Sequence, residues 1–407
     1  MTTKNILVIA WQWNNTGGDW SYAKSITSTY IEKGFRVTVL SSGNSHEEIG
    51  QIKTIRTKSL LKRDINSFKD KLRFPWSFLR QNQLSSDEEK YLFNTEWYFV
   101  HIHSIIGGPG FKVIQKIKSN TPILYTLHDY HLSCPTTNHF RDGENCMECI
   151  DESPLNSIKN NCRGNIVEST AAYLLNKLFI NSNEIKRIKY FLCPSEFMNK
   201  TMIKMGISKQ KLKTIGLCLD KNSIKELTDE DNIFFEKKKY RPFVFYAGRL
   251  ESYKGIKTLI EACSKIGIRL LIAGDGSFKN YLTKYIKNHK LDVKLLGKIP
   301  KKELANYIRN SICVVVPSEW HENFPFAVTE SLFLGTPVIG SSMGGIPELI
   351  KNGYNGYIFE ARNAIDLRKK LTLIMKKGVF WKKREIMNDI RQRFDCNNHL
   401  NKILDLV

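Results

Sequence analysis

The sequence predicts an α/β protein built from two doubly wound domains, each organised around a parallel β-sheet. Short, nearly continuous apolar runs alternate with helical patterns, and this alternation is typical of βαβ units. One series of strand candidates precedes residue 220, and a second follows residue 240, after a polar and charged segment. At 407 residues, the chain is also too long for one ordinary core.

The strand candidates of the first series are residues 6–10, 36–40, 99–102, 123–127 and 190–193. Those of the second are residues 243–247, 269–273, 293–296, 313–316, 337–339 and 356–359. Their apolarity is typical of strands covered on both faces. Since residues 220–240 have the composition of a linker, we expect domains at 1–220 and 221–380. Residues 381–407 are expected to form one helix that returns to the first domain.

The formal net charge of +22 indicates an anionic partner, although scattered lysine on a soluble surface is an equally good explanation. We find no recognisable nucleic-acid-binding motif, so we expect no nucleic-acid partner. The first apolar run is too short for a signal peptide, and no stretch approaches the ~18 apolar residues of a spanning helix. We therefore expect a cytoplasmic protein.

A candidate phosphate-binding loop follows strand 243–247. Gly248 lets the backbone approach a ligand closely, and Arg249 and Lys254 are able to hold two phosphates at once. Ligands of doubly wound proteins bind at the carboxyl ends of such strands. The alternative is a surface turn with two solvated cations.

A second loop follows strand 313–316 and carries Glu322, with Pro325 suited to the first turn of a helix. Glu330 then lies among apolar residues of that helix, where a carboxylate is costly unless it is paired or hydrogen-bonded. A carboxylate is a good acceptor for a ribose diol, and amides at a helix N-terminus bind phosphate or hydroxyl oxygens. The alternative is a helix with one solvent-facing glutamate.

Glu322 and Glu330 resemble the E-x7-E motif of glycosyltransferase family 4, the retaining GT-B enzymes. Other segments resemble that family in the same order, namely residues 16–18, 34–39, 248–255, 273–276, 335–339 and 344–348. The resemblance runs nearly the whole chain and implies the GT-B fold, with two Rossmann-like domains facing a cleft. Residues 216–220 depart from it, since relatives often carry Asn-Gly there.

The resemblance implies a role for individual residues. Arg249 and Lys254 would neutralise the leaving diphosphate, and His128, at the end of strand 123–127 and beside Asp129, would reach the donor sugar from the opposing domain. A structural histidine is the alternative. The implied catalytic residues are His128, Arg249, Lys254 and Glu322. The implied donor-binding residues are Gly17, Gly18, Gly248, Asn323, Phe324, Pro325 and Glu330, with Glu330 on the ribose and residues 322–325 on the sugar.

The resemblance also implies the activity of a retaining, metal-independent glycosyltransferase. The donor would be a UDP- or GDP-linked sugar, and the acceptor a glycan or polyprenyl-linked glycan in envelope polysaccharide, lipopolysaccharide or capsule biosynthesis. Residues 229–231 match the letters of a metal-binding Asp-x-Asp but lie in the charged linker. A non-catalytic nucleotide-sugar or glycan-binding protein is the alternative. A dinucleotide oxidoreductase would need a Gly-x-Gly-x-x-Gly after the first strand, and this chain has none there.

Four cysteines form a candidate structural zinc site: Cys134, Cys146, Cys149 and Cys162. A Cys-x2-Cys pair flanked by two further cysteines suits tetrahedral zinc. Residues 134–162 have few apolar side chains and would gain order from a metal, and some bacterial members of the resembled family show a similar insert. Four free thiols are the alternative. The other cysteines, including Cys218 and Cys396, show no cluster and are expected to be reduced.

Residues 53–80 combine many basic side chains with interleaved aromatic ones. Such a segment is able to rest on an anionic bilayer, which would make the protein peripheral on the inner face of the plasma membrane. The alternative is an ordinary loop over the first domain.

Overall fold

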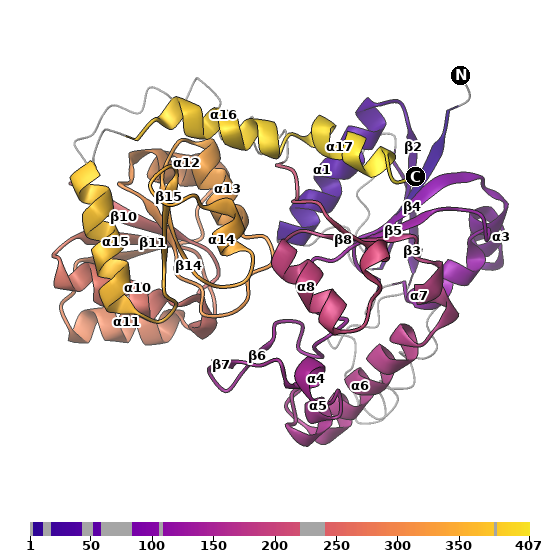
Figure 1. Cartoon of the computed structure of the whole chain (residues 1–407), viewed down its shortest axis with the longest axis horizontal. Coiled ribbons are helices and arrows are strands. Elements are labelled where there is room, and N and C mark those ends of the chain that lie inside the picture. Colours follow the sequence, from indigo (N-terminus) through magenta and orange to yellow (C-terminus); the bar gives the residue numbers. More distant parts are fainter. Residues whose placement is uncertain are drawn as a thin grey trace. The chain divides into compact units, whose positions relative to one another are not determined.

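The computed structural model describes residues 3–10, 18–42, 52–57, 84–105, 109–219, 241–377 and 381–407. The chain divides into two compact units (Figure 1). Unit 1 comprises Met1–His139, Cys146–Cys218 and Cys396–Val407, and unit 2 comprises Phe140–Asn145 and Leu219–Asp395. Each unit has its own parallel sheet and its own core, which confirms the predicted α/β class with two doubly wound sheets.

The sheet of unit 1 has the strand order β3-β2-β1-β4-β5-β8-β9, and its paired strands are parallel. The strands are β1 (Asn5–Ile9), β2 (Arg36–Ser42), β3 (Lys53–Thr57), β4 (Trp97–Ile102), β5 (Ile123–Thr126), β8 (Tyr190–Cys193) and β9 (Leu212–Thr214). The central strands are apolar and buried, because helices cover both faces of a parallel sheet. The edge strands β3 and β9, which carry lysine, escaped the sequence analysis.

Several helices of unit 1 begin at residues whose side chains accept hydrogen bonds from free backbone amides. Ser85 and Glu88 form a capping box at α3 (Ser86–Asn94), and Asn165 and Ser195 cap α6 (Ile166–Ile180) and α8 (Glu196–Lys204). The remaining helical segments are α1 (Gly18–Glu32), η2 (Phe111–Lys116), α4 (Glu148–Asp151), α5 (Asn156–Lys159), α7 (Asn183–Arg187), η3 (Lys209–Lys211) and α17 (Cys396–Leu404).

The sheet of unit 2 has the strand order β12-β11-β10-β13-β14-β15. In chain order this is 3-2-1-4-5-6, the order of a dinucleotide-binding doubly wound sheet, with its reversal between β10 and β13. The strands are β10 (Phe243–Ala247), β11 (Arg269–Ala273), β12 (Val293–Gly297), β13 (Val314–Val316), β14 (Val338–Ser341) and β15 (Gly356–Phe359). Ligands of such sheets bind outside the carboxyl ends of the strands at the reversal.

The helical segments of unit 2 are η5 (Ser252–Lys254), α10 (Ile256–Lys265), α11 (Lys279–Asn288), α12 (Lys301–Asn310), α13 (Phe326–Phe333), α14 (Ile346–Leu349), α15 (Ala364–Lys377) and α16 (Lys383–Arg393). A short antiparallel hairpin, β6 (Phe140–Arg141) and β7 (Glu144–Asn145), also belongs to unit 2. Asn145 Nδ2 donates to the Glu319 carbonyl over 3.0 Å, and Arg362 pairs with Glu144. The cysteine-containing insert thus divides between the units.

The C-terminal segment, expected to be one helix, is two helices. α16 belongs to unit 2, where it packs on α13, and α17 belongs to unit 1, where it packs on α1. The helix that belongs to unit 1 is thus a separate one, which begins at Cys396.

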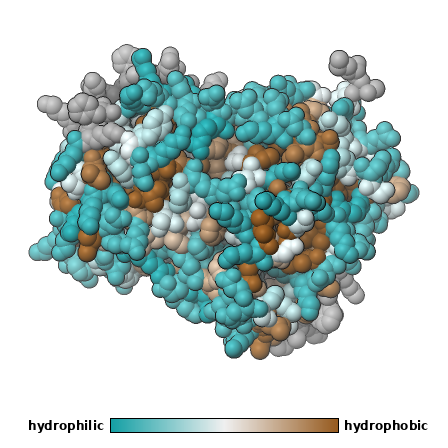
Figure 2. All heavy atoms as spheres, in the orientation of Figure 1, coloured by the Kyte–Doolittle hydropathy of each residue, from teal (hydrophilic) through white to brown (hydrophobic). Residues whose placement is uncertain are grey.

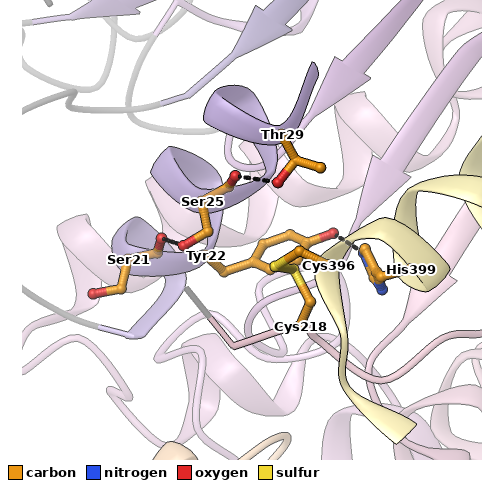
Figure 3. Close-up of a disulfide and its surroundings, with 7 residues drawn as sticks. All are labelled: Ser21, Tyr22, Ser25, Thr29, Cys218, Cys396 and His399. Carbon is orange, nitrogen blue, oxygen red and sulfur yellow. Dashed lines mark hydrogen bonds between the residues drawn. A yellow bond between two sulfur atoms is a disulfide. The ribbon is translucent and has the colours of Figure 1, made fainter. Parts of the chain in front are cut away.

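Cys218 and Cys396 form a disulfide within unit 1, which corrects the expectation that both are reduced (Figure 3). They lie 178 residues apart in sequence, and their Cα atoms are 5.0 Å apart. A hydrogen bond of 2.6 Å between Tyr22 of α1 and His399 of α17 lies beside it. Because the partners are so far apart in sequence, cysteine spacing carried no sign of this pair. No helix within the described ranges is long and apolar enough to cross a membrane.

Candidate functional site

The candidate site of unit 2 is built from the loops that follow β10 and β13, the two strands at the reversal of the sheet, and from the loop that follows β14. These loops approach each other so closely that glycine is required. Gly255 has a φ of +67°, and a Cβ there would overlap the carbonyl oxygen of Pro317. Gly344 has a φ of +57°, and a Cβ there would overlap the carbonyl oxygen of Glu322. The glycines of the predicted motifs thus bring Lys254 and Glu322 together.

Glu322 is the most strongly held side chain of this site. Its Oε1 accepts from Lys254 Nζ at 2.6 Å, from Ser318 Oγ at 2.6 Å and from Trp320 Nε1 at 3.0 Å. The Lys254 and Glu322 side chains are only 14% and 11% exposed. Burial alone would raise the pKa of Glu322, but Lys254 and these hydrogen bonds outweigh burial and lower it below its ordinary value. Glu322 is therefore an ionised carboxylate with a fixed orientation.

The pairing refines the prediction for the two basic residues. Lys254, expected to be available to a diphosphate, forms an ion pair with Glu322. Arg249 is exposed, and its backbone carbonyl accepts from the Tyr246 hydroxyl at 2.9 Å, which fixes the loop next to exposed Gly248. Arg249 is thus an exposed residue whose side chain contacts Tyr253, whereas the ammonium of Lys254 lies in a buried ion pair.

Glu330 lies half-buried in α13, the position at which a carboxylate was predicted to be costly. Burial raises its pKa to about 7, and Lys301 opposes this shift. Asn323 is buried, and Pro325 is the N-cap residue of α13. The Phe324 ring packs on the rings of Phe326 and Phe394, so this side chain serves the core of unit 2.

His128 of unit 1 lies just after β5, as predicted, but its neighbours differ from those expected. Its Nε2 is 3.2 Å from His103 Nδ1, and its ring lies 5.5 Å from that of Tyr22. Asp129, its sequence neighbour, instead accepts from His131 Nδ1 at 2.5 Å. Burial would raise the pKa of Asp129, but contact with His131 prevails and lowers it.

Further buried histidines surround His128 and were missed by the sequence analysis. His101 Nδ1 bonds the Tyr30 hydroxyl at 2.7 Å, and its Nε2 bonds Thr126 Oγ1 at 2.8 Å. Burial lowers the pKa of His101 and His103 well below the ordinary value, so both rings are neutral at neutral pH. The signal that could have revealed them is the His101-x-His103 alternation at the end of β4, which places both rings on one face of the sheet.

Some predicted features cannot be located. Gly17, residues 58–80 of the basic segment and residues 229–231 lie outside the described residues. Gly18 is the first residue of α1, and residues 53–57 of the basic segment form the edge strand β3.

The four cysteines of the predicted zinc site form no disulfide. Burial raises the pKa of the Cys149 thiol to about 12, and the thiols of Cys134, Cys162 and Cys146 add to this shift. Within the described ranges, however, no three of the His, Cys, Asp and Glu side chains are arranged to hold one metal ion. Structural zinc therefore stays a prediction.

Residues 228–393 match the family described as Glycosyl transferases group 1. Unit 2 carries a group 1 glycosyltransferase domain. An uncharacterized glycosyltransferase of Methanocaldococcus jannaschii is 32% identical over 130 residues, which are 32% of this chain and 37% of that protein. The chain thus matches little more than a third of that relative's length.

Solved structures resemble the chain over nearly its whole length. Sucrose-phosphate synthase of Thermosynechococcus elongatus has a TM-score of 0.71 at 18% identity, covering 99% of this chain and 98% of its own. Anabaena HepE in complex with UDP has a TM-score of 0.64 at 16% identity, covering 99% of each chain. These similarities establish the fold, which is GT-B with two Rossmann-like domains, the second of them the group 1 glycosyltransferase domain.

Proposed function

We propose that the chain is a retaining, metal-independent glycosyltransferase of family 4. It transfers a sugar from a UDP- or GDP-linked donor to a glycan or polyprenyl-linked glycan in the biosynthesis of an envelope polysaccharide, such as lipopolysaccharide or capsule. The group 1 domain over residues 228–393 supports the reaction class. The UDP bound in the Anabaena HepE structure supports a nucleotide donor.

The observation that carries the proposal is the fixed carboxylate of Glu322 at the reversal point of the sheet. All three hydrogen bonds to it reach Oε1, from Lys254, Ser318 and Trp320. Its other oxygen, Oε2, is therefore the one able to accept from a hydroxyl of the donor sugar. A carboxylate held in this way needs no reorganisation when the sugar binds, which favours transition-state stabilisation.

The two cations act on the leaving diphosphate. Arg249 is exposed and able to present its planar fork to phosphate oxygens. Lys254 holds Glu322 in the ligand-free protein and has further donor hydrogens on the same ammonium. One lysine is thus able to position the sugar-binding carboxylate and to stabilise charge that develops on the diphosphate.

Glu330 holds the ribose diol through its carboxylate. Since its pKa is raised to about 7, a large part of the ligand-free population is protonated at neutral pH. An ionised carboxylate accepts from both ribose hydroxyls, so nucleotide binding favours loss of that proton. In unit 1, His128 serves the donor sugar and the remaining surface serves the acceptor. The proposed location is cytoplasmic, with residues 53–80 as a candidate contact to the membrane.

A donor screen with product analysis tests this proposal. The full chain is incubated with UDP- and GDP-linked sugars and a polyprenyl-linked glycan acceptor, and nucleotide release and the anomeric configuration of the product are measured. The expected result is acceptor-dependent release with retention, lost in Glu322→Gln and unaffected by EDTA. Tight nucleotide-sugar binding without release across the screen would favour the alternative, a non-catalytic binding protein. Activity lost in EDTA and restored by Mn²⁺ would refute metal independence.

A further inference from the structure

The hairpin of the cysteine-containing insert, β6 (Phe140–Arg141) and β7 (Glu144–Asn145), belongs to unit 2, although its two ends continue into unit 1. Asp142, at its turn, is exposed and pairs with Arg141 at 3.2 Å. Teal, hydrophilic spheres predominate in Figure 2 at the place where Figure 1 shows β6 and β7. Since the hairpin belongs to neither parallel sheet, its side-chain contacts must account for its place in unit 2.

The hairpin contacts two loops of the candidate site. Asn145 Nδ2 donates to the backbone carbonyl of Glu319 at 3.0 Å, and Glu319 precedes Glu322 in the loop after β13. The Phe140 ring lies 5.7 Å from the ring of Tyr253, which belongs to the loop after β10. The backbone amide of Glu319 donates to the carbonyl of Tyr253 at 2.8 Å, so the two loops are also joined to each other.

Arg362, in the loop between β15 and α15, ties the hairpin to Glu319. Its guanidinium pairs with Glu144 and donates to the carbonyl of Gly143, and its Nε lies 3.5 Å from Glu319 Oε2. Thr258 Oγ1 donates to the other carboxylate oxygen, Oε1, at 3.0 Å. The φ of Arg362 is +65°, a left-handed conformation that is unfavourable for a residue with a Cβ. Such a conformation persists where the surrounding contacts hold it, and here those contacts lie on the hairpin and on Glu319.

Trp320 carries these contacts to the carboxylate of Glu322. It follows Glu319 directly, its ring lies 5.5 Å from that of Tyr253, and Lys254 Nζ lies 4.8 Å from its ring centre. Its Nε1 donates to Glu322 Oε1 at 3.0 Å, the oxygen that also accepts from Lys254. Because the indole is held on the Tyr253 ring, the loop that the hairpin holds also orients Glu322.

We propose that Arg362, together with Phe140 and Asn145 of the hairpin, positions the donor site. These residues hold residues 318–322 so that Trp320 fixes Oε1 of Glu322 and leaves Oε2 to the donor sugar. This role rests on the proposed function, in which Glu322 holds that sugar. Loss of the hairpin contacts should weaken binding of a nucleotide sugar more than binding of the nucleotide alone, because only the sugar needs Glu322.

Arg362→Gly separates positioning from stability, because it removes the guanidinium and also relieves the left-handed backbone. Glycine adopts this conformation freely, and the lost ion pairs are partly exposed, so the urea midpoint should match wild type. In the ligand-free variant, the Glu319 amide should nevertheless exchange hydrogen about fivefold faster. Asn145→Ala should act in the same direction and suffices if Arg362→Gly fails to fold. Lys290→Gly is the matched control, since Lys290 is exposed and has a φ of +48°.

Calorimetric titration then compares UDP with UDP-glucose, and GDP with GDP-mannose, on the full chain. Arg362→Gly should bind the nucleotide sugar about fivefold more weakly than wild type and bind the nucleotide equally well. Unchanged exchange in Arg362→Gly and Asn145→Ala, or exchange that rises only with a fall in the urea midpoint, would overturn the proposal. An equal loss of nucleotide and nucleotide-sugar affinity would overturn the role in sugar recognition. Wild type that binds none of the four probes would contradict the proposed function, and hydrogen exchange would still decide whether the hairpin holds residues 318–322.

Discussion

Replacing Lys254 with Met should destabilise the protein strongly, because it leaves the carboxylate of Glu322 in a buried site without its cation. Removing one partner of a buried ion pair costs about 3–5 kcal/mol. The side chains are 14% and 11% exposed, so solvent screens them little. Glu322 retains the hydrogen bonds from Ser318 and Trp320 in this variant. We therefore expect the lower end of the range, about 3 kcal/mol at pH 7.

The loss should depend on pH with a defined sign. In the wild type the folded pKa of Glu322 is lowered, so its stabilisation is present above the unfolded pKa of about 4.3 and is lost as pH falls through the folded value. In Lys254→Met, burial would prevail and raise that pKa. The variant then gains stability as pH falls, because its folded state takes up a proton. The difference in unfolding free energy between the two proteins should shrink from pH 7 to pH 5.

Urea unfolding of the ligand-free proteins at pH 7 and pH 5 provides the measurement, with the m-value as a check that the same transition is compared. Lys257→Met is the matched control, because Lys257 forms an exposed i,i+4 pair with Glu261 at 3.8 Å. That change should cost less than about 0.5 kcal/mol. A cost below about 1 kcal/mol for Lys254→Met, or an equal cost at both pH values, would refute the buried network.

Three further predictions concern other groups. Burial raises the folded pKa of Glu330 to about 7, so wild-type stability should fall as pH rises from about 4.5 to 7.5, by at most about 3 kcal/mol. Glu330→Gln should abolish that fall, as measured by urea unfolding at pH 5 and pH 8. If the unfolding free energies of wild type and variant change equally between these pH values, the prediction is wrong. Cys218→Ser removes the cross-link between residues 178 apart in sequence and should lower the free energy of unfolding by up to about 5 kcal/mol, because the unfolded chain regains loop-closure entropy. An unchanged urea midpoint would count against the disulfide to Cys396. Elemental analysis of the purified protein should find about one zinc per chain, and the double variant Cys146→Ser/Cys149→Ser should lose it. Zinc added to the metal-free protein at pH 7 should also release protons, because the Cys149 thiol must ionise to bind it. Well-folded wild type without zinc would end that prediction.

Much of the fold could be predicted because it depends on local patterns. Buried strands such as β8 (Tyr190–Cys193), β10 (Phe243–Ala247) and β15 (Gly356–Phe359) were predicted with their observed bounds, since continuous apolarity marks a strand covered on both faces. The edge strand β3 (Lys53–Thr57) was missed because one side of an edge strand meets solvent and tolerates charge. The break between α16 and α17 was missed as well, because helical patterns continue on both sides of it.

The sequence by itself determined which residues stand at the carboxyl ends of the strands, because strand and loop signals act over a few neighbours. It therefore placed Arg249, Glu322 and His128 in their loops. Only the tertiary structure decided the pairing of these groups. Lys254 meets Glu322 across 68 residues, and Cys218 meets Cys396 across 178, and neither distance is encoded in a local pattern. Such contacts follow from how sheets order their strands, so a side chain's partner, and with it its charge, is a property of the folded chain.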